Sequence, residues 1–313
     1  HLMKKDAQIA ALTAPEALPA TNVSNVGFVA NWNTVSSANY YEVDVMRIFS
    51  TTEDAEYLSL YEDFLLMQEY PSEVTGYLDG LTYRWDWYLY GGKLADRSIV
   101  FPQTSSKGQT QLQTPMMDFS GEGETETVYF SFVAEGAVGD KIGIGYYYTD
   151  DEGEDLAFAF QPVTFEEGTM TKTLYAELPA VDALGFLIYT DPTMQNTGDV
   201  KLKTFLVSRE FAAGTEFMEV YDYRQTAETS ASFFTIEKDT ETEGVSDEFV
   251  YGVYALNVDM NKGEILDMSD MSDMILVGAT GSVEGVKASR EKIFVHDKLH
   301  VVLDKPETVS VYN

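Results

Sequence analysis

The stretch KIGIGYYYTD at residues 141–150 alternates isoleucine with glycine and ends its apolar part in three tyrosines. A two-residue period is typical of a β-strand with one buried face, and Ile142 and Ile144 mark that face here. Other parts of the chain carry runs of the same kind, bounded by Gly, Asp, Asn or Pro. These runs lie at 27–32, 40–49, 82–90, 127–136, 156–165 and 248–259. The sequence therefore predicts an all-β protein built from several β-sandwiches.

The chain is strongly acidic, with 20 Lys and Arg against 52 Asp and Glu among its 313 residues, a net charge of −32. Nucleic acid and anionic membranes are poor partners for such a surface, because neutralising phosphates takes a surplus of cations. A hydrophobic content of 44% supplies a core. No apolar run approaches the length of about 18 residues that a membrane span requires, so no membrane insertion is expected.

Composition changes divide the chain into modules. The polar run at 102–111 has the composition of a linker, and further changes occur near 208–216 and 278–291. One stretch, 52–69, spaces its apolar residues as a short helix would, with acidic residues in its first turn. The expected parts are a tail at 1–12, β-sandwiches at 13–102, 106–210 and 211–278, and a β-hairpin module at 279–313.

The first module contains GFVANW (27–32), YYEVDVMR (40–47) and TYRWDWYLY (82–90). It resembles a fibronectin type III domain. The resemblance implies that Trp32 is the core tryptophan of one strand and that Tyr83 is the corner tyrosine of another. The 211–278 module resembles a second domain of this type, with a strand at 248–259. It is short for the family, so its first strand is either missing or supplied from elsewhere.

The 106–210 module opens with QLQTPMMDFSGEGETETVYFSFVAEG (111–136) and closes with GDVKLKTFLVSREF (198–211). It resembles the jelly-roll domains of secreted adhesins and polysaccharide-active proteins of Bacteroidetes-type bacteria. The usual acidic pair before the last strand is replaced here by Gly198 and Asp199. The resemblance implies a secreted or cell-surface modular protein, either extracellular or lipid-anchored.

A carbohydrate site is one reading of the 106–210 module. The alternation in 141–150 places Tyr147 on the same face as Gly143 and Gly145, which leaves a bare strip beside an aromatic ring. Tyr129 and Tyr189 are the expected neighbours on that outer face. Cross-strand packing of these tyrosines is the ordinary alternative.

Calcium is the second candidate ligand, because it binds carboxylate and carbonyl oxygens and jelly-roll domains of the resembled kind often hold it. Asp118 and Asp199 would approach each other if the first and last strands are neighbours, with Glu122 and Glu124 in the adjacent loop. A solvated acidic turn is the alternative. No cofactor is otherwise expected.

Catalytic chemistry has little support in the sequence. The chain has no cysteine, and besides His1 its histidines are His296 and His300, which flank a predicted hairpin turn. No nucleophile elbow, phosphate-binding loop or HExxH motif occurs. We therefore expect a non-catalytic protein for adhesion, or an accessory part of a polymer-processing system, that contacts an extracellular glycan or protein surface. A carbohydrate-binding protein is the alternative, an enzyme fragment without a recognisable site is the third reading, and the oligomeric state stays open.

Overall fold

The computed structural model describes residues 12–95, 97–103, 108–121, 123–150, 152–235 and 244–278. They form 20 strands and one three-residue 3-10 helix, η1 (Pro192–Met194), so the all-β prediction is confirmed. Within these ranges no helix has the length and apolar character needed to cross a membrane. The predicted hairpin module at 279–313, with His296 and His300, lies outside the described residues.

The chain folds into two compact units, and the second is inserted into the first. Residues 51–215 form the second unit, whereas the described part of the first unit consists of 12–50 and 216–278. This division differs from the modules predicted at 13–102, 106–210 and 211–278. The physical reason is strand pairing: Glu216 pairs with Ser50, so the segments on either side of the insertion complete one sheet.

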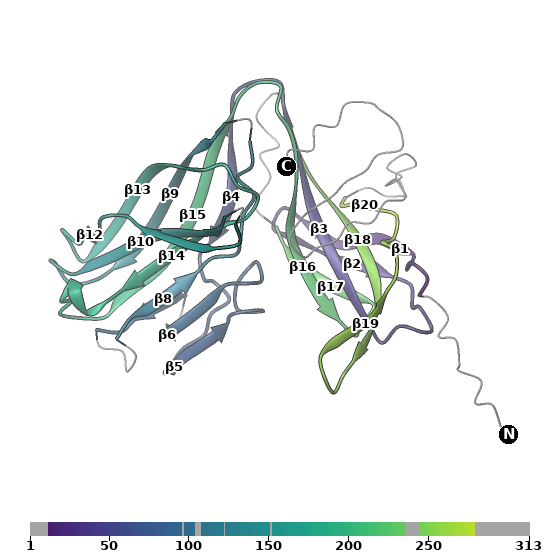
Figure 1. Ribbon diagram of the computed structural model, residues 1–313, viewed down its shortest axis with the longest axis horizontal. Helices are drawn as coiled ribbons and strands as arrows, with labels where there is room; N and C mark the ends of the chain where they lie inside the picture. The colour runs from purple at the N-terminus through teal and green to yellow at the C-terminus, as the bar shows by residue number, and fades with distance from the viewer. Residues whose placement is uncertain are drawn as a thin grey trace. The chain divides into compact units, whose positions relative to one another are not determined.

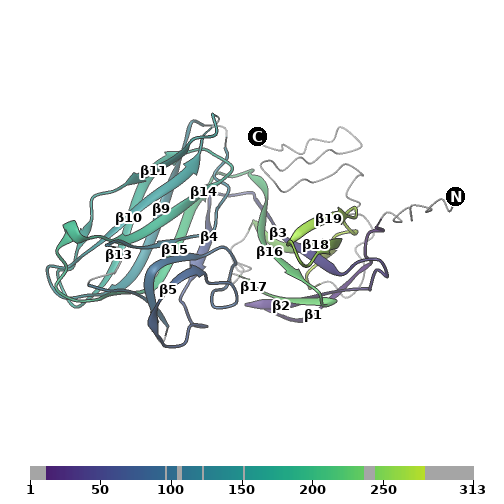
Figure 2. The same cartoon turned by 60° about the horizontal axis from the view of Figure 1, so that its bottom comes forward.

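The first unit is a sandwich of two sheets, which lie one below the other in Figure 2. Phe28 and Tyr251 stack across the core with ring centroids 5.9 Å apart, and Trp32 packs against Tyr41. One sheet has the order β1 (Ala17–Ser24), β2 (Gly27–Trp32) and β17 (Ser230–Phe234). The other has the order β16 (Glu216–Thr226), β3 (Tyr40–Thr51), β18 (Val245–Asp259) and β19 (Glu264–Met268), with β20 (Ile275–Leu276) also paired to β18.

The acidic run DMSDMSD at 267–273 follows the edge of β18. The backbone N–H of Ser269 donates to the carbonyl of Ala255, and the N–H of Ala255 donates back to the Ser269 hydroxyl at 2.9 Å. Ser272 and Val253 repeat this exchange. The serines therefore fasten this run to the sheet, which gives its three-residue repeat a structural role.

The second unit is also a two-layer sandwich, and Figure 1 shows its strands side by side. The first layer has the order β11 (Asp155–Ala159), β10 (Lys141–Thr149), β14 (Leu184–Thr190), β8 (Thr110–Gln113) and β6 (Tyr88–Ala95), with β5 (Tyr70–Tyr77) beside β6 and β12 (Val163–Thr164) beside β10. The second layer holds β13 (Thr169–Pro179), β9 (Thr125–Glu135), β15 (Val200–Phe211) and β4 (Ala55–Glu62). The short β7 (Ser98–Phe101) pairs with both β6 and β15 and so links the layers.

Aromatic rings fill the space between these layers. Phe186 of the first layer contacts Phe130 and Phe205 of the second, with ring centroids 5.4 Å and 5.9 Å apart. Ile142 and Ile144 are buried in the same core, as the alternation predicts. The opposite side of the first layer therefore faces away from the core, and we call it the outer face.

Two local predictions are wrong. The helix expected at 52–69 is instead the strand β4, because its residues pair with β15 over seven positions, from Phe205 with Glu62 to Phe211 with Ala55. The run at 82–90 becomes a strand only from Tyr88, and it belongs to the second unit. Tyr83 is therefore not the corner tyrosine of the first unit; its hydroxyl donates to the Asp63 carboxylate at 2.7 Å.

Candidate functional site

The outer face of the second unit carries a regular array of side chains, because paired residues on adjacent strands point to the same side. The array has three rows. One row runs through Gly143, Tyr189, Gln111, Tyr90 and Thr75. The next runs through Ala159, Gly145, Leu187, Gln113, Tyr88 and Tyr77. The third holds Ala157, Tyr147 and Gly185.

Tyr189 lies flat on the glycine opposite it. A Cβ atom added to Gly143 would meet three carbons of the Tyr189 ring at 2.4 Å, 2.6 Å and 2.7 Å. These near-equal distances place Gly143 under the face of the ring and not at its edge. Since Tyr189 is only half-buried, the other ring face is turned away from the sheet. A side chain at position 143 would displace the ring.

Tyr147 is held in the same manner on the neighbouring strand. Its ring covers Gly185, where an added Cβ would meet ring atoms at 2.6 Å, and its hydroxyl donates to the carbonyl of Thr114 at 3.1 Å. The expected bare strip above Gly143 and Gly145 is therefore partly filled, by Tyr189 and not by Tyr147. The prediction that Tyr147 and Tyr189 share one outer face agrees with this arrangement.

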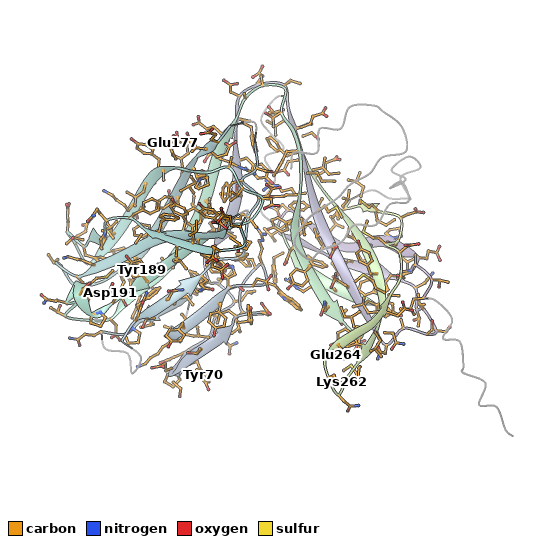
Figure 3. The ribbon with its side chains drawn as sticks, in the orientation of Figure 1. Tyr70, Glu177, Tyr189, Asp191, Lys262 and Glu264 are labelled. Atoms are coloured by element: carbon orange, nitrogen blue, oxygen red, sulfur yellow. The ribbon has the colours of Figure 1, made fainter. Side chains whose placement is uncertain are left out.

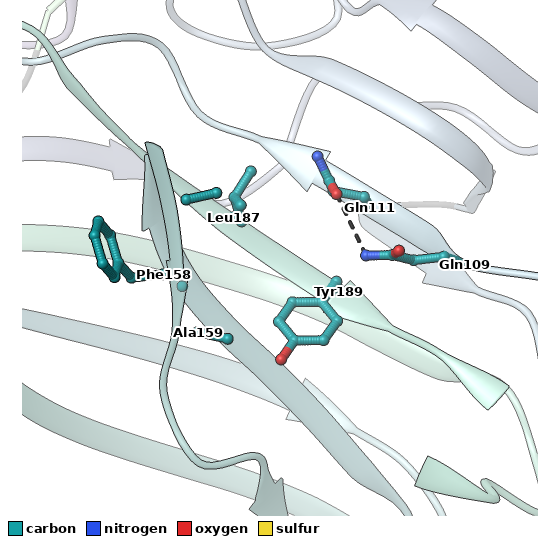
Figure 4. Close-up of a pocket in the computed structure, with 8 residues that line it drawn as sticks. Gln109, Gln111, Phe158, Ala159, Leu187 and Tyr189 are labelled. Atoms are coloured by element: carbon teal, nitrogen blue, oxygen red, sulfur yellow. Dashed lines mark hydrogen bonds between the residues drawn. The ribbon is translucent and has the colours of Figure 1, made fainter. Parts of the chain in front are cut away.

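A shallow pocket of about 320 Å³ opens beside Tyr189 (Figure 4). Gln109 donates to the side-chain oxygen of Gln111 at 3.4 Å on one side of it, and alanines of β11 form the other side. None of the side chains that line the pocket carries a charge. The lining residues are Gln109, Gln111, Gly145, Ala157, Phe158, Ala159, Leu187 and Tyr189. Such a pocket offers an aromatic face and amide groups together.

The phenols of Tyr147 and Tyr189 stay neutral at physiological pH. Burial, together with Tyr77 and Asp86, raises the pKa of Tyr147 to about 12. Burial and the adjacent Asp191 raise the pKa of Tyr189 (Figure 3). Both hydroxyls therefore remain able to donate and accept hydrogen bonds across the pH range in which proteins usually work.

Tyr129 does not join Tyr147 and Tyr189. It lies on β9 in the second layer, paired with Tyr175 of β13, and their ring centroids are 6.4 Å apart. Tyr175 is 74% exposed, so this pair forms a separate aromatic patch on the opposite side of the sandwich. Alternation places a residue on one side of its own strand, but it does not say which layer the strand joins.

The residues predicted to bind calcium are also separated. Asp118 accepts from the backbone N–H of Ser120 at 2.8 Å, and Asp199 accepts from the N–H of Gln103 at 2.9 Å. Phe119, next to Asp118, packs against the guanidinium of Arg209 near the far end of β15, whereas Asp199 precedes the first residue of that strand. Ten residues of strand span about 30 Å, so the two carboxylates do not converge.

The other two predicted ligands add nothing to this picture. Glu124 is exposed, and Glu122 lies outside the described residues. Among the residues that the structure describes, no three His, Asp or Glu side chains group as a metal ion would require. Calcium binding stays a prediction without a site to which it can be assigned.

The array also contains tyrosines of β6 and β5, which the sequence does not place beside Tyr189. Tyr88 and Tyr90 pair with Gln113 and Gln111, and Tyr77 contacts Tyr88 edge-to-face with ring centroids 5.1 Å apart. The alternation of TYRWDWYLY does place Tyr88 and Tyr90 opposite the buried Leu89. It could not show that this strand lies two places from β14.

No protein-family model matches the sequence, and no curated protein is significantly similar to it. Among solved structures, the chain is similar to the CBM22-1 and GH10 modules of a Clostridium thermocellum endo-1,4-β-D-xylanase complexed with xylohexaose. The identity is 16% and the TM-score 0.30, over 49% of this chain and 28% of that one. The CBM22-1 xylan-binding domain of a Paenibacillus barcinonensis protein gives 12% and 0.31 over 51% and 97%. A family 29 carbohydrate-binding module gives 17% and 0.26 over 50% and 89%. These TM-scores are low, so the similarities do not assign a ligand to this chain.

Proposed function

We propose that the protein is a non-catalytic glycan-binding protein whose site is the outer face of the second unit, around Tyr189. The observation that carries the proposal is the Tyr189 ring laid flat on Gly143 with its other face turned outward, next to the Tyr147 ring that covers Gly185 on the neighbouring strand. Sugar rings present apolar C–H faces that stack on such aromatic surfaces, and amides beside them can bond the sugar hydroxyls. Gln109 and Gln111 supply those amides next to Tyr189.

The fixed position of the rings favours binding. Tyr147 is tied by its hydroxyl to Thr114, and both rings rest on backbone, so little side-chain freedom is lost when a ligand stacks on them. The proposal includes an extracellular or cell-surface location. It also keeps the fibronectin type III resemblance of the first unit, which the strand orders β1-β2-β17 and β16-β3-β18-β19 support. Adhesion would then be one use of a glycan contact.

Affinity gel electrophoresis tests the proposal with soluble xylan, glucomannan, galactomannan and mixed-linkage glucan cast into the gels. We expect at least one polysaccharide to retard the protein. Tyr189→Ala should abolish the retardation, and Tyr189→Phe should keep most of it because the ring face remains.

Tyr175→Ala is the matched control, since it removes an exposed tyrosine from the opposite side of the same unit. Equal loss in Tyr175→Ala and Tyr189→Ala would place the contact elsewhere. Binding by none of the polysaccharides, with a correctly folded protein, would overturn the proposal for these glycans.

A further inference from the structure

The pocket beside Tyr189 is only one end of a longer array. The row that begins at Ala159 crosses β11, β10, β14, β8, β6 and β5 and ends at Tyr77. Five spacings between adjacent strands amount to about 24 Å. This width is several times that of one sugar ring, so a ligand confined to the pocket would leave most of the array empty.

A second group of aromatic side chains occupies the far end. Tyr77 is 66% exposed and Tyr90 is 37% exposed, and neither lines the pocket. Tyr77 and Tyr88 meet edge-to-face, which turns one ring upright beside the other. A group of neighbouring exposed aromatic side chains, unlike a single scattered one, is typical of a contact surface.

The two ends are continuous on the sheet. The Tyr147 hydroxyl donates to the carbonyl of Thr114, which directly follows Gln113 of β8, and Gln113 pairs with Tyr88, so Tyr147 leads toward the far end, while Tyr189 adjoins the pocket. Gln111 and Gln113 of β8 stand between the two groups. Amides flanked by aromatic rings on both sides suit a chain of linked sugar rings better than a single sugar.

The lack of charged side chains in the three rows restricts the class of ligand further. The three rows contain Gly, Ala, Leu, Thr, Gln and Tyr side chains and no Lys, Arg, Asp or Glu. A carboxylate or sulfate on the ligand would find no cation in these rows, within a protein whose net charge is −32. An uncharged chain avoids both the missing partner and the long-range repulsion.

We infer that the ligand is an uncharged oligosaccharide chain that runs across the strands, from the pocket beside Tyr189 to Tyr77 and Tyr88. This inference rests on the proposed function and adds the length, direction and charge of the ligand. The oligosaccharide then contacts the protein in two separate regions, and a shorter ligand loses the binding free energy that the second region contributes.

Isothermal titration calorimetry tests this with xylo-, cello- and mannohexaose and the matching disaccharides, and with hexagalacturonate as the charged probe. For the hexasaccharide that binds, Tyr77→Ala should weaken binding about tenfold, the equivalent of about 1.4 kcal/mol, and it should leave disaccharide binding unchanged. Tyr189→Ala should abolish binding of both lengths, and Tyr175→Ala should change neither.

The outcomes separate the two proposals. If Tyr189→Ala abolishes binding but Tyr77→Ala leaves hexasaccharide affinity unchanged, the chain does not reach β5, and this inference is wrong while the site stands. Hexagalacturonate that binds as tightly as the neutral hexasaccharides would overturn the assignment of charge. Binding of both ligand lengths that is unchanged in Tyr189→Ala would refute the proposed function itself.

Discussion

Asp44 on β3 offers a sharp test of how burial acts in the first unit. Its side chain is 2% exposed, and its Oδ2 has no hydrogen-bond partner among the described residues. Burial, with a smaller contribution from Glu42, raises the pKa of Asp44 from 3.8 to about 8. The folded protein therefore keeps a proton on Asp44 that the unfolded chain releases.

The sign of the effect follows from proton linkage. Between pH 4 and 8 the folded state binds more protons than the unfolded state, so the free energy of unfolding falls as the pH rises through this window. One group of this kind contributes about 1.4 kcal/mol per pH unit, or about 3 kcal/mol between pH 5 and 7. Asp44→Asn is uncharged at every pH and should remove this contribution.

The assay is urea unfolding at pH 5, 6, 7 and 8, followed by tryptophan fluorescence. Trp32 reports on the first unit, and Trp85 and Trp87 report on the second; a Trp32→Phe background assigns the transitions. We expect the difference in unfolding free energy between Asp44→Asn and wild type to grow in favour of the variant as the pH rises. A difference that stays constant from pH 5 to 8 would show that Asp44 is ionised in the folded protein and would refute the reasoning.

Two further substitutions test buried charge elsewhere. Glu62 is fully buried, its carboxylate accepts from the N–H groups of Phe64 and Tyr83 at 2.9 Å and 2.7 Å, and burial raises its pKa to about 8. Glu62→Gln should lower the free energy of unfolding by about 1–3 kcal/mol, because the amide N–H₂ group cannot accept one of these two hydrogen bonds. In the same urea series, it should also flatten the pH dependence of the unfolding free energy, and only for the second unit. Arg47 and Asp247 form a buried two-point ion pair at 2.8 Å and 2.6 Å, so Arg47→Met should cost about 3–5 kcal/mol in thermal unfolding. Arg47→Met with Asp247→Leu should recover most of that loss, and a single variant as stable as wild type would contradict burial of the pair.

Local pattern predicted individual strands well. GFVANW forms β2 with Trp32 buried, and KIGIGYYYTD forms β10 with Ile142 and Ile144 in the core. In both cases the side that faces the core is decided by residues two positions apart, and this information is present in a short stretch of sequence.

Pairing over long distances was beyond such patterns. Ser50 pairs with Glu216, and no local feature of either strand predicts a partner so distant in the sequence. For the same reason alternation predicts that Tyr129 and Tyr189 are neighbours, although the two lie in different layers. The helical spacing at 52–69 misled because β4 carries a register shift near Val207 of its partner strand, which breaks simple alternation.

The insertion between β3 and β16 has a consequence for synthesis on the ribosome. The strands β1, β2 and β3 emerge early, and β1 can pair with β2 at once, but β17, the other partner of β2, and β16 and β18, the partners of β3, follow only after residues 51–215 have been made. The second unit is one continuous segment, so it can complete its fold while β3 and one edge of β2 still lack partners. Nascent chains would therefore carry a folded second unit together with unpaired strand edges of the first, a stage at which chaperone binding or a slowed translation rate would matter most.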